Sequence, residues 1–274
     1  MKVDKGMIFG LLGPNGSGKT TTLGLLLGVL KATAGSFRWF GKEPTADARK
    51  NIGAILETPC FYPYLTAMQN LAVVATIKEC SQERREEVLQ TVGLFERRND
   101  PFKTFSLGMK QRLAIGSALL SDPEVLILDE PTNGLDPQGI VEIRNLVQHI
   151  AGTGKSIVLA SHLLDEVQKV CTDFCVLRKG VKLYQGSVVE ALAEDATFEL
   201  ASRDLDVLFR AVQEFSGVKD LKRLNDRLSL SVEKGITTEV LNAFLIDRQI
   251  VLTLLVEKAG TLEQQFLNIL AEHD

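Results

Sequence analysis

Residues 7–20 read MIFGLLGPNGSGKT and join an apolar run to a glycine-rich run. Residues 7–12 are apolar over the length of one strand, as expected for a strand buried on both faces of a parallel sheet. Residues 13–18 are too rich in glycine for regular structure. Residues 19–30 have helical length and stop near residues 33–35, which read TAG. The order strand, loop, helix places a ligand of the loop at the carboxyl end of the strand.

The loop matches the pattern G-x-x-x-x-G-K-[ST]. Its glycines allow successive backbone N–H groups to turn toward a phosphate, and the following helix points its positive end at the same place. We expect Lys19 to reach the β- and γ-phosphates and the Thr20 hydroxyl to ligate Mg²⁺. A plain glycine turn before a helix is the alternative, but the strand and helix around the loop are the context that the motif requires. The predicted phosphate-binding residues are Gly13, Pro14, Asn15, Gly16, Ser17, Gly18, Lys19, Thr20 and Thr21.

A second apolar strand, at residues 125–128, ends in two carboxylates and a proline, DEP. Asp129 is expected at the carboxyl edge of the sheet, where it would hold Mg²⁺ directly or through water. Because neighbouring residues at a strand end diverge, Glu130 is free to face a water molecule as general base or as water-positioning group. The alternative is a solvated acidic turn.

Strands alternate with helices over the first two thirds of the chain, which predicts an α/β fold with a mostly parallel sheet covered on both faces. Beyond residue 197 the glycine loops stop, and a β-α-β-β-α-β order with a trailing helix predicts a small ferredoxin-like α+β unit. We therefore expect domains at 1–194 and 197–274, with a helical subdomain at about 58–122. The predicted strands lie at 36–40, 125–128, 156–160, 174–177, 182–185 and 250–256, and the predicted helices at 19–30, 65–79, 82–92, 106–120, 140–151, 163–170, 204–215, 237–246 and 262–270.

The composition is that of a folded protein, with 45% hydrophobic and 24% charged residues among 274. Lys and Arg number 31 and Asp and Glu 35, a net charge of −4 that argues against nucleic acid as a partner. Four scattered cysteines predict reduced thiols, not a disulfide framework, and no signal peptide is evident. Residues 58–77 carry no charge, but two prolines, Gln69 and Asn70 argue against a membrane span.

Three further sequence features follow in order. Residues 105–112 read FSLGMKQR, residues 133–136 read NGLD, and His162 follows the next predicted strand. Alone, Ser106 is typical of a helix N-cap. Together with the glycine loop and the acidic strand, the ordered set resembles the nucleotide-binding subunits of ABC transporters, over residues 6–187.

The resemblance implies a P-loop NTPase that binds and hydrolyses ATP with Mg²⁺ as a homodimer. Glu130, His162 and Lys19 would be catalytic. Ser106 and Gly108 of one copy would bind the γ-phosphate of ATP held by the other, and Asp136 would link the two sites. The remaining partner would be a separate integral membrane permease, with this chain at the cytoplasmic face of the plasma membrane. His149 and His273 are read as surface residues.

The chain departs from the family pattern at several positions. Leu107 and Met109 replace a glycine and a glutamine, as in the subgroup that serves drug export and antibiotic-peptide immunity. Glu57 stands where the family has a glutamine, and it has either a metal or coupling role or none. No aromatic residue matches the family's adenine platform, and the first strands are missing. Either the start is assigned too late, or Trp39 or Phe40 holds adenine.

Two segments have open roles. The uncharged residues 58–77 begin where family members receive a helix of the membrane subunit. They contain an aromatic patch of Phe61, Tyr62, Tyr64 and Leu65. This patch is either a docking site or part of the core of the helical subdomain. Residues 262–266 match an LExxF motif of export-type subunits and are dimer-stabilising, regulatory or only structural.

The function we expect is ATP-driven transport, in the direction of export, through the separate permease. One alternative is an ABC-type ATPase of assembly or repair. The other is a truncated module that binds partners and hydrolyses little ATP.

Overall fold

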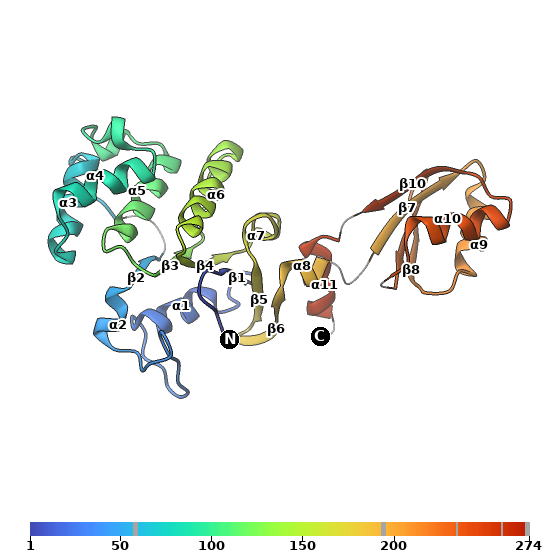
Figure 1. Cartoon of the computed structure of the whole chain (residues 1–274), viewed down its shortest axis with the longest axis horizontal. Helices are drawn as coiled ribbons and strands as arrows, with labels where there is room; N and C mark the ends of the chain where they lie inside the picture. The colour runs from blue at the N-terminus through green and yellow to red at the C-terminus, as the bar shows by residue number, and fades with distance from the viewer. Residues whose placement is uncertain (57–59, 193–195, 234, 259, 272–274) are drawn as a thin grey trace. The chain divides into compact units, whose positions relative to one another are not determined.

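The computed structural model describes residues 1–56, 60–192, 196–233, 235–258 and 260–271. The chain divides into two compact units, Met1–Gln185 and Gly186–Asp274 (Figure 1). Each unit has its own sheet and its own buried apolar residues. In the part of the chain that is described, no helix is long and apolar enough to cross a membrane.

The first unit is built on a sheet whose described strands run in the order β2-β3-β4-β1-β5-β6. The pairs β2–β3, β3–β4, β4–β1 and β1–β5 are parallel. Leu12 at the end of β1 pairs with Ser161 at the end of β4, and Asp129 at the end of β3 pairs with Ala160. The carboxyl ends of β1, β3 and β4 therefore meet at one edge. The bounds are β1 Ile8–Leu12, β2 Ile52–Ile55, β3 Val125–Asp129, β4 Ser156–Ser161, β5 Asp173–Arg178 and β6 Val181–Ser187.

Helices cover both faces of this sheet, as the alternation predicts. One face of β1 packs through Phe9 and Leu11 against Leu23 of α1. On the other face, Gly10 lies against α7. Figure 1 shows α3, α4 and α5 grouped apart from α1 and α2, and they form the helical subdomain. The helices are α1 Lys19–Leu27, α2 Ala46–Lys50, α3 Ala67–Lys78, α4 Gln82–Thr91, α5 Leu107–Leu119, α6 Pro137–Gly152 and α7 Leu164–Val170, with short 3₁₀ turns η1 Phe95–Arg97 and η2 Phe102–Thr104.

Replacement of Gly10 by Ala is expected to destabilise the protein by about 1–3 kcal/mol, the usual cost of overpacking. A Cβ at this position would lie 2.7 Å from Val167 Cγ1 and 3.3 Å from Cys171 Sγ, both on or next to α7. Gly152→Ala is the matched control, because a Cβ there meets nothing within 4 Å. Urea unfolding measures both variants, and equal stability of the two would contradict the prediction.

The predicted strand at 36–40 is wrong. Trp39 and Lys42 form an isolated bridge instead, with backbone bonds of 3.0 and 2.9 Å in the two directions. Phe40 and Gly41 between them have φ values of 54° and 74°, so the chain reverses in a two-residue turn. A strand needs a neighbouring strand for its backbone groups, and in the described residues no strand flanks this segment.

Two predicted helix bounds also shift for local reasons. Helix α1 ends at Leu27, not at residue 30, because Gly28 adopts the left-handed conformation, and the N–H groups of Val29 and Leu30 both donate to Gly24 O. Helix α6 begins at Pro137, before the predicted 140, because Asp136 Oδ1 accepts the N–H of Gly139 at 3.0 Å.

The second unit has the described strand order β10-β7-β9-β8, with antiparallel neighbours. Alternate residues of β7 and β9, such as Phe198 and Leu230, are fully buried against α9 and α10. This confirms the predicted ferredoxin-like α+β appendage. The bounds are β7 Ala196–Ser202, α9 Leu205–Gln213, β8 Val218–Arg223, β9 Leu228–Val232, α10 Thr238–Asp247 and β10 Leu252–Lys258, and the helices α8 Val188–Leu192 and α11 Leu262–Ala271 pack on each other.

All four cysteines are free thiols in the structure. Cys171 and Cys175 are buried, and burial raises the pKa of the Cys175 thiol to about 11. Cys60 is exposed and so is not part of the core.

Candidate functional site

The glycine loop at residues 13–18 is closed by its own backbone and by the β5–β6 turn. Ser17 N–H donates to Pro14 O at 3.1 Å, and Gly180 N–H donates to Ser17 O at 2.9 Å. A Cβ at Gly13 would lie 2.4 Å from Leu177 O, so a side chain at this position does not fit. Gly18, with φ of 104°, precedes the first residue of α1 in a conformation that glycine adopts readily.

Lys19 is a buried cation inside this loop, with 7% of its surface exposed. Its Nζ donates to Gly13 O at 2.7 Å and to Pro14 O at 3.5 Å, and it lies 3.5 Å from Glu130 Oε1. Among the described residues no side chain caps α1, so the first N–H groups of the helix point toward the loop without an internal acceptor. The free N–H groups and the ammonium of Lys19 together favour an anion.

Thr20 and Asp129 bring the loop and the acidic strand together. Thr20 Oγ1 donates to Asp129 Oδ2 at 2.7 Å, and Asp129 is 5% exposed at the end of β3. A hydroxyl and a carboxylate at this separation suit Mg²⁺, which takes oxygen ligands and usually binds through one or two carboxylates plus phosphates and water. The described residues hold no group of three or more His, Cys, Asp or Glu side chains that could bind a metal ion. Glu57 lies outside the described residues.

Glu130 and His162 meet at the same edge of the sheet. Glu130 Oε2 lies 2.8 Å from His162 Nδ1, and the backbone N–H of Glu130 donates to Ala160 O at 2.9 Å. Glu130 has φ of 48°, a conformation that costs a non-glycine residue energy and is held here by the neighbouring strand. Its carboxylate therefore bridges Lys19 and His162. Three predicted catalytic residues, from the start of α1 and from the carboxyl ends of β3 and β4, form one cluster.

Ser106, Gly108 and Asp136 lie elsewhere in the unit. Ser106 Oγ accepts the N–H of Met109 at 3.3 Å and caps α5, while Asp136 caps α6. In the described residues, no hydrogen bond or ion pair joins these three to the glycine loop. Within a single copy, then, they take no part in the Lys19–Glu130–His162 cluster, and their role in nucleotide binding stays a prediction.

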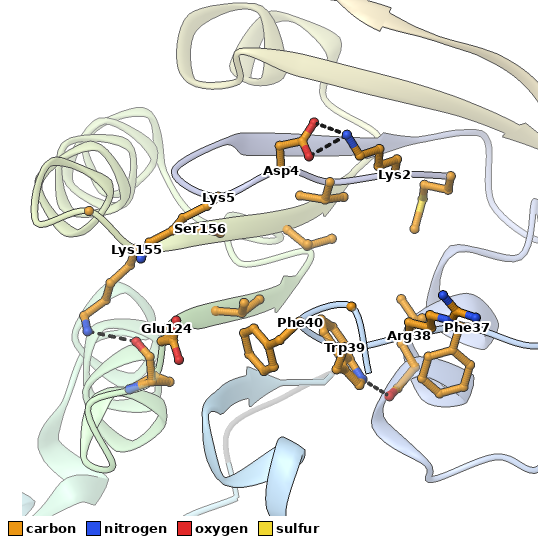
Figure 2. Close-up of a pocket in the computed structure, with 18 of the residues that line it drawn as sticks. Lys2, Asp4, Lys5, Phe37, Arg38, Trp39, Phe40, Glu124, Lys155 and Ser156 are labelled. Carbon is orange, nitrogen blue, oxygen red and sulfur yellow. Dashed lines mark hydrogen bonds and ion pairs between the residues drawn. The ribbon is translucent and has the colours of Figure 1, made fainter. Parts of the chain in front are cut away.

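Trp39 and Phe40 are not placed to hold the adenine of a nucleotide bound at the loop. Trp39 Nε1 donates to Leu26 O at 3.0 Å, near the end of α1 opposite to the loop. Both aromatics line a cavity of about 790 Å³ with Lys155 and Ser156, at the amino ends of the strands (Figure 2). The loop lies at the carboxyl ends, so the sheet separates the cavity from it.

Sequence reasoning missed the β5–β6 turn as part of the site. It placed residues 178–180 only between the predicted strands at 174–177 and 182–185, and the signal for a larger role was weak because the contact with the loop depends on the pairing of β5 with β1. Lys179 and Gly180, with φ of 49° and 79°, form the tight two-residue turn that brings the Gly180 N–H to Ser17.

The comparisons with known proteins agree with this geometry. A family profile described as ABC transporter matches residues 1–133. The chain is 45% identical over 183 residues to YhcH of Bacillus subtilis, an uncharacterized ABC transporter ATP-binding protein, covering 65% of this chain and 60% of YhcH. It is 40% identical over 189 residues to SrtF of Streptococcus pyogenes, a lantibiotic transport ATP-binding protein, covering 69% of this chain and 80% of SrtF.

A solved structure gives the same result for the fold. CbiO1 from Clostridium perfringens, part of the ABC transporter complex CbiONQ, superposes with a TM-score of 0.65 at 30% identity. The superposition covers 71% of this chain and 82% of CbiO1. The chain belongs to the family of ABC transporter ATP-binding proteins. This family is one of P-loop ATPases, and the predicted α/β fold class is confirmed.

One departure of this ABC protein from the family pattern has a visible contact. Leu107, where the family has glycine, is 42% exposed at the start of α5. A Cβ at Gly134 would lie 3.3 Å from Leu107 Cδ2. The leucine thus packs on the turn that precedes Asp136 and brings residues 105–112 into contact with residues 133–136.

Proposed function

We propose that this chain binds and hydrolyses ATP and so powers transport, in the direction of export, by a separately encoded membrane permease. The observation that carries the proposal is the cluster of Lys19, Glu130 and His162 beside Thr20 and Asp129. These groups supply a phosphate-binding cation, a candidate general base with its partner, and a candidate metal site at one edge of the sheet.

In this proposal the residues of the glycine loop bind the phosphates of ATP. Lys19 turns from Glu130 to the β- and γ-phosphates, and Glu130 is then free to hold the attacking water. His162, which contacts Glu130 at 2.8 Å, keeps that carboxylate in place and reaches the γ-phosphate. Mg²⁺ would be held by Thr20 and Asp129 and would neutralise charge on the phosphates. Glu57 remains a further candidate ligand.

The complete site needs two copies of the chain. Ser106, Gly108 and Asp136 lie on α5 and α6 without a bond to the glycine loop of their own copy. A second copy facing the first would bring the N-terminus of α5 to the γ-phosphate, where its N–H groups suit an anion. This supports an ATP-dependent homodimer.

The permease would bind an aromatic patch beside α3. Tyr62 and Tyr64 are exposed with their ring centroids 5.9 Å apart, and Ile77 on α3 is 79% exposed. Phe61 and Leu65 are partly buried, and Phe61 packs edge-on against Phe102 at 5.1 Å. The predicted patch therefore divides, and the two tyrosines are the part that a partner helix can cover. Such docking would hold the chain at the cytoplasmic face of the membrane.

Export of a peptide antibiotic is the transport reaction that we propose. The names of relatives such as SrtF support it, because that protein is named for lantibiotic transport. A strain lacking this chain should become more sensitive to such peptides, and the Glu130→Gln variant should fail to restore resistance.

Purified Glu130→Gln protein tests the central proposal. With ATP and Mg²⁺ it should form a dimer in light scattering, and without ATP it should stay monomeric. The same variant with Ser106→Arg added should bind ATP but not dimerise, because the added side chain blocks the N-terminus of α5. Absence of nucleotide binding would favour a non-enzymatic partner-binding module instead.

A further inference from the structure

Helices α6 and α7 are joined by a bidentate ion pair that lies outside the predicted site. Arg144 Nε donates to Glu166 Oε2 at 3.0 Å, and Arg144 Nη2 donates to Glu166 Oε1 at 2.6 Å. Glu166 is only 8% exposed, and its hydrogen bonds raise the pKa of Arg144 above its ordinary value. Two parallel bonds fix the angle between the groups as well as their distance.

Both helices begin close to residues that the sequence predicts for the site. Helix α7 starts at Leu164, two residues after His162, and Glu166 lies in its first turn. Helix α6 starts directly after its N-cap Asp136, and Arg144 lies two turns further along. The ion pair therefore ties the segment that carries His162 to the helix that carries Asp136.

Helix α6 also contacts α5, the helix that Ser106 caps. Arg112 Nη2 of α5 lies 3.6 Å from Glu142 Oε2 of α6, and Figure 1 shows α6 between α5 and α7. If a second copy displaced α5 or Asp136, α6 would thus transmit the displacement to Glu166. The Arg144–Glu166 pair is the most buried ionic contact on this route.

We propose that Arg144 and Glu166 are positioning residues, which set His162 against Glu130 in response to the position of Asp136. The proposal rests on the ATPase function proposed above. Replacing a buried ion pair by well-packed apolar residues is often neutral for stability. We therefore assign to this pair the geometry that its two bonds fix between α6 and α7, not an effect of its charge.

Steady-state ATPase assays of the full chain test the proposal. Arg144→Gln and Glu166→Gln should lower kcat about tenfold, the scale of a small misplacement of a catalytic group, with KM for ATP nearly unchanged. The double variant Arg144→Glu with Glu166→Arg restores an ion pair and should recover most of kcat. Gln148→Ala is the matched control, because Gln148 Nε2 also joins the two helices, through Lys169 O at 3.1 Å, but far from His162.

A second measurement does not depend on turnover. The imidazole NMR signal of His162, identified by its loss in His162→Ala, should move in Glu166→Gln and stay in place in Gln148→Ala. An unchanged His162 signal, or a folded charge-swap variant without recovered kcat, would overturn the inference. If the wild-type chain hydrolyses no ATP, the proposed function fails, while the His162 signal still decides whether the ion pair positions this histidine.

Discussion

Replacement of Glu130 by Gln should lower the rate of ATP hydrolysis by about 10²–10⁴-fold, the usual contribution of a general base. The glutamine keeps the size of the side chain and its bond to His162, but it accepts no proton. ATP binding should persist or tighten, because Lys19 loses a carboxylate partner at 3.5 Å and one negative charge leaves the neighbourhood of the triphosphate. Single-turnover hydrolysis and calorimetric ATP binding separate the two effects.

Glu124→Gln is the matched control for this change. Glu124 is exposed at the amino end of β3, while Glu130 follows the carboxyl end of the same strand. Its replacement should leave turnover near that of the wild type. A Glu130→Gln variant that hydrolyses ATP at the wild-type rate would show that another group activates the water.

Replacement of Lys19 by Ala should weaken ATP binding by at least about 100-fold. The β- and the γ-phosphate would each lose one hydrogen bond from Lys19, and a hydrogen bond to a charged group is worth about 1.5–3 kcal/mol. The ammonium is buried and held by Gly13 O beside the glycine loop, so its side chain is already ordered before ATP binds. Calorimetric titration with MgATP measures the affinity.

The loop itself should survive the loss of Lys19, because Ser17 and Gly180 close it through backbone bonds. An unchanged thermal midpoint of Lys19→Ala would confirm this. Lys31→Ala, an exposed lysine beyond the other end of α1, controls for the loss of one positive charge. Equal ATP affinity in the Lys19 and Lys31 variants would remove Lys19 from the binding site.

Segments that depend on bonds between near neighbours were predictable from the sequence. The glycine loop, the cap at Ser106 and the alternating strands of the second unit follow from residue types within a few positions of one another. The predicted strand at 36–40 failed because its pattern carries no information about a partner strand, and the backbone turned at Phe40 and Gly41 instead.

The site was predictable as a set of residues but not as a set of contacts. Resemblance placed Lys19, Glu130 and His162 in one family pattern, yet it did not show that Glu130 bridges the other two. It also did not indicate that Asp136 would be occupied as a helix cap.

The amino-acid order thus sufficed for the phosphate loop and the acidic strand end, because each is a short run with its own geometry. Their meeting did not follow from either run. Thr20 and Asp129 are 109 positions apart, and they touch because β1 and β3 both pair with β4 in parallel, which aligns their carboxyl ends. The same long-range pairing places the Gly180 turn on the loop, and helix packing places Arg144 on Glu166. Such contacts arise from the folding of distant segments onto one sheet, and no local pattern encodes them.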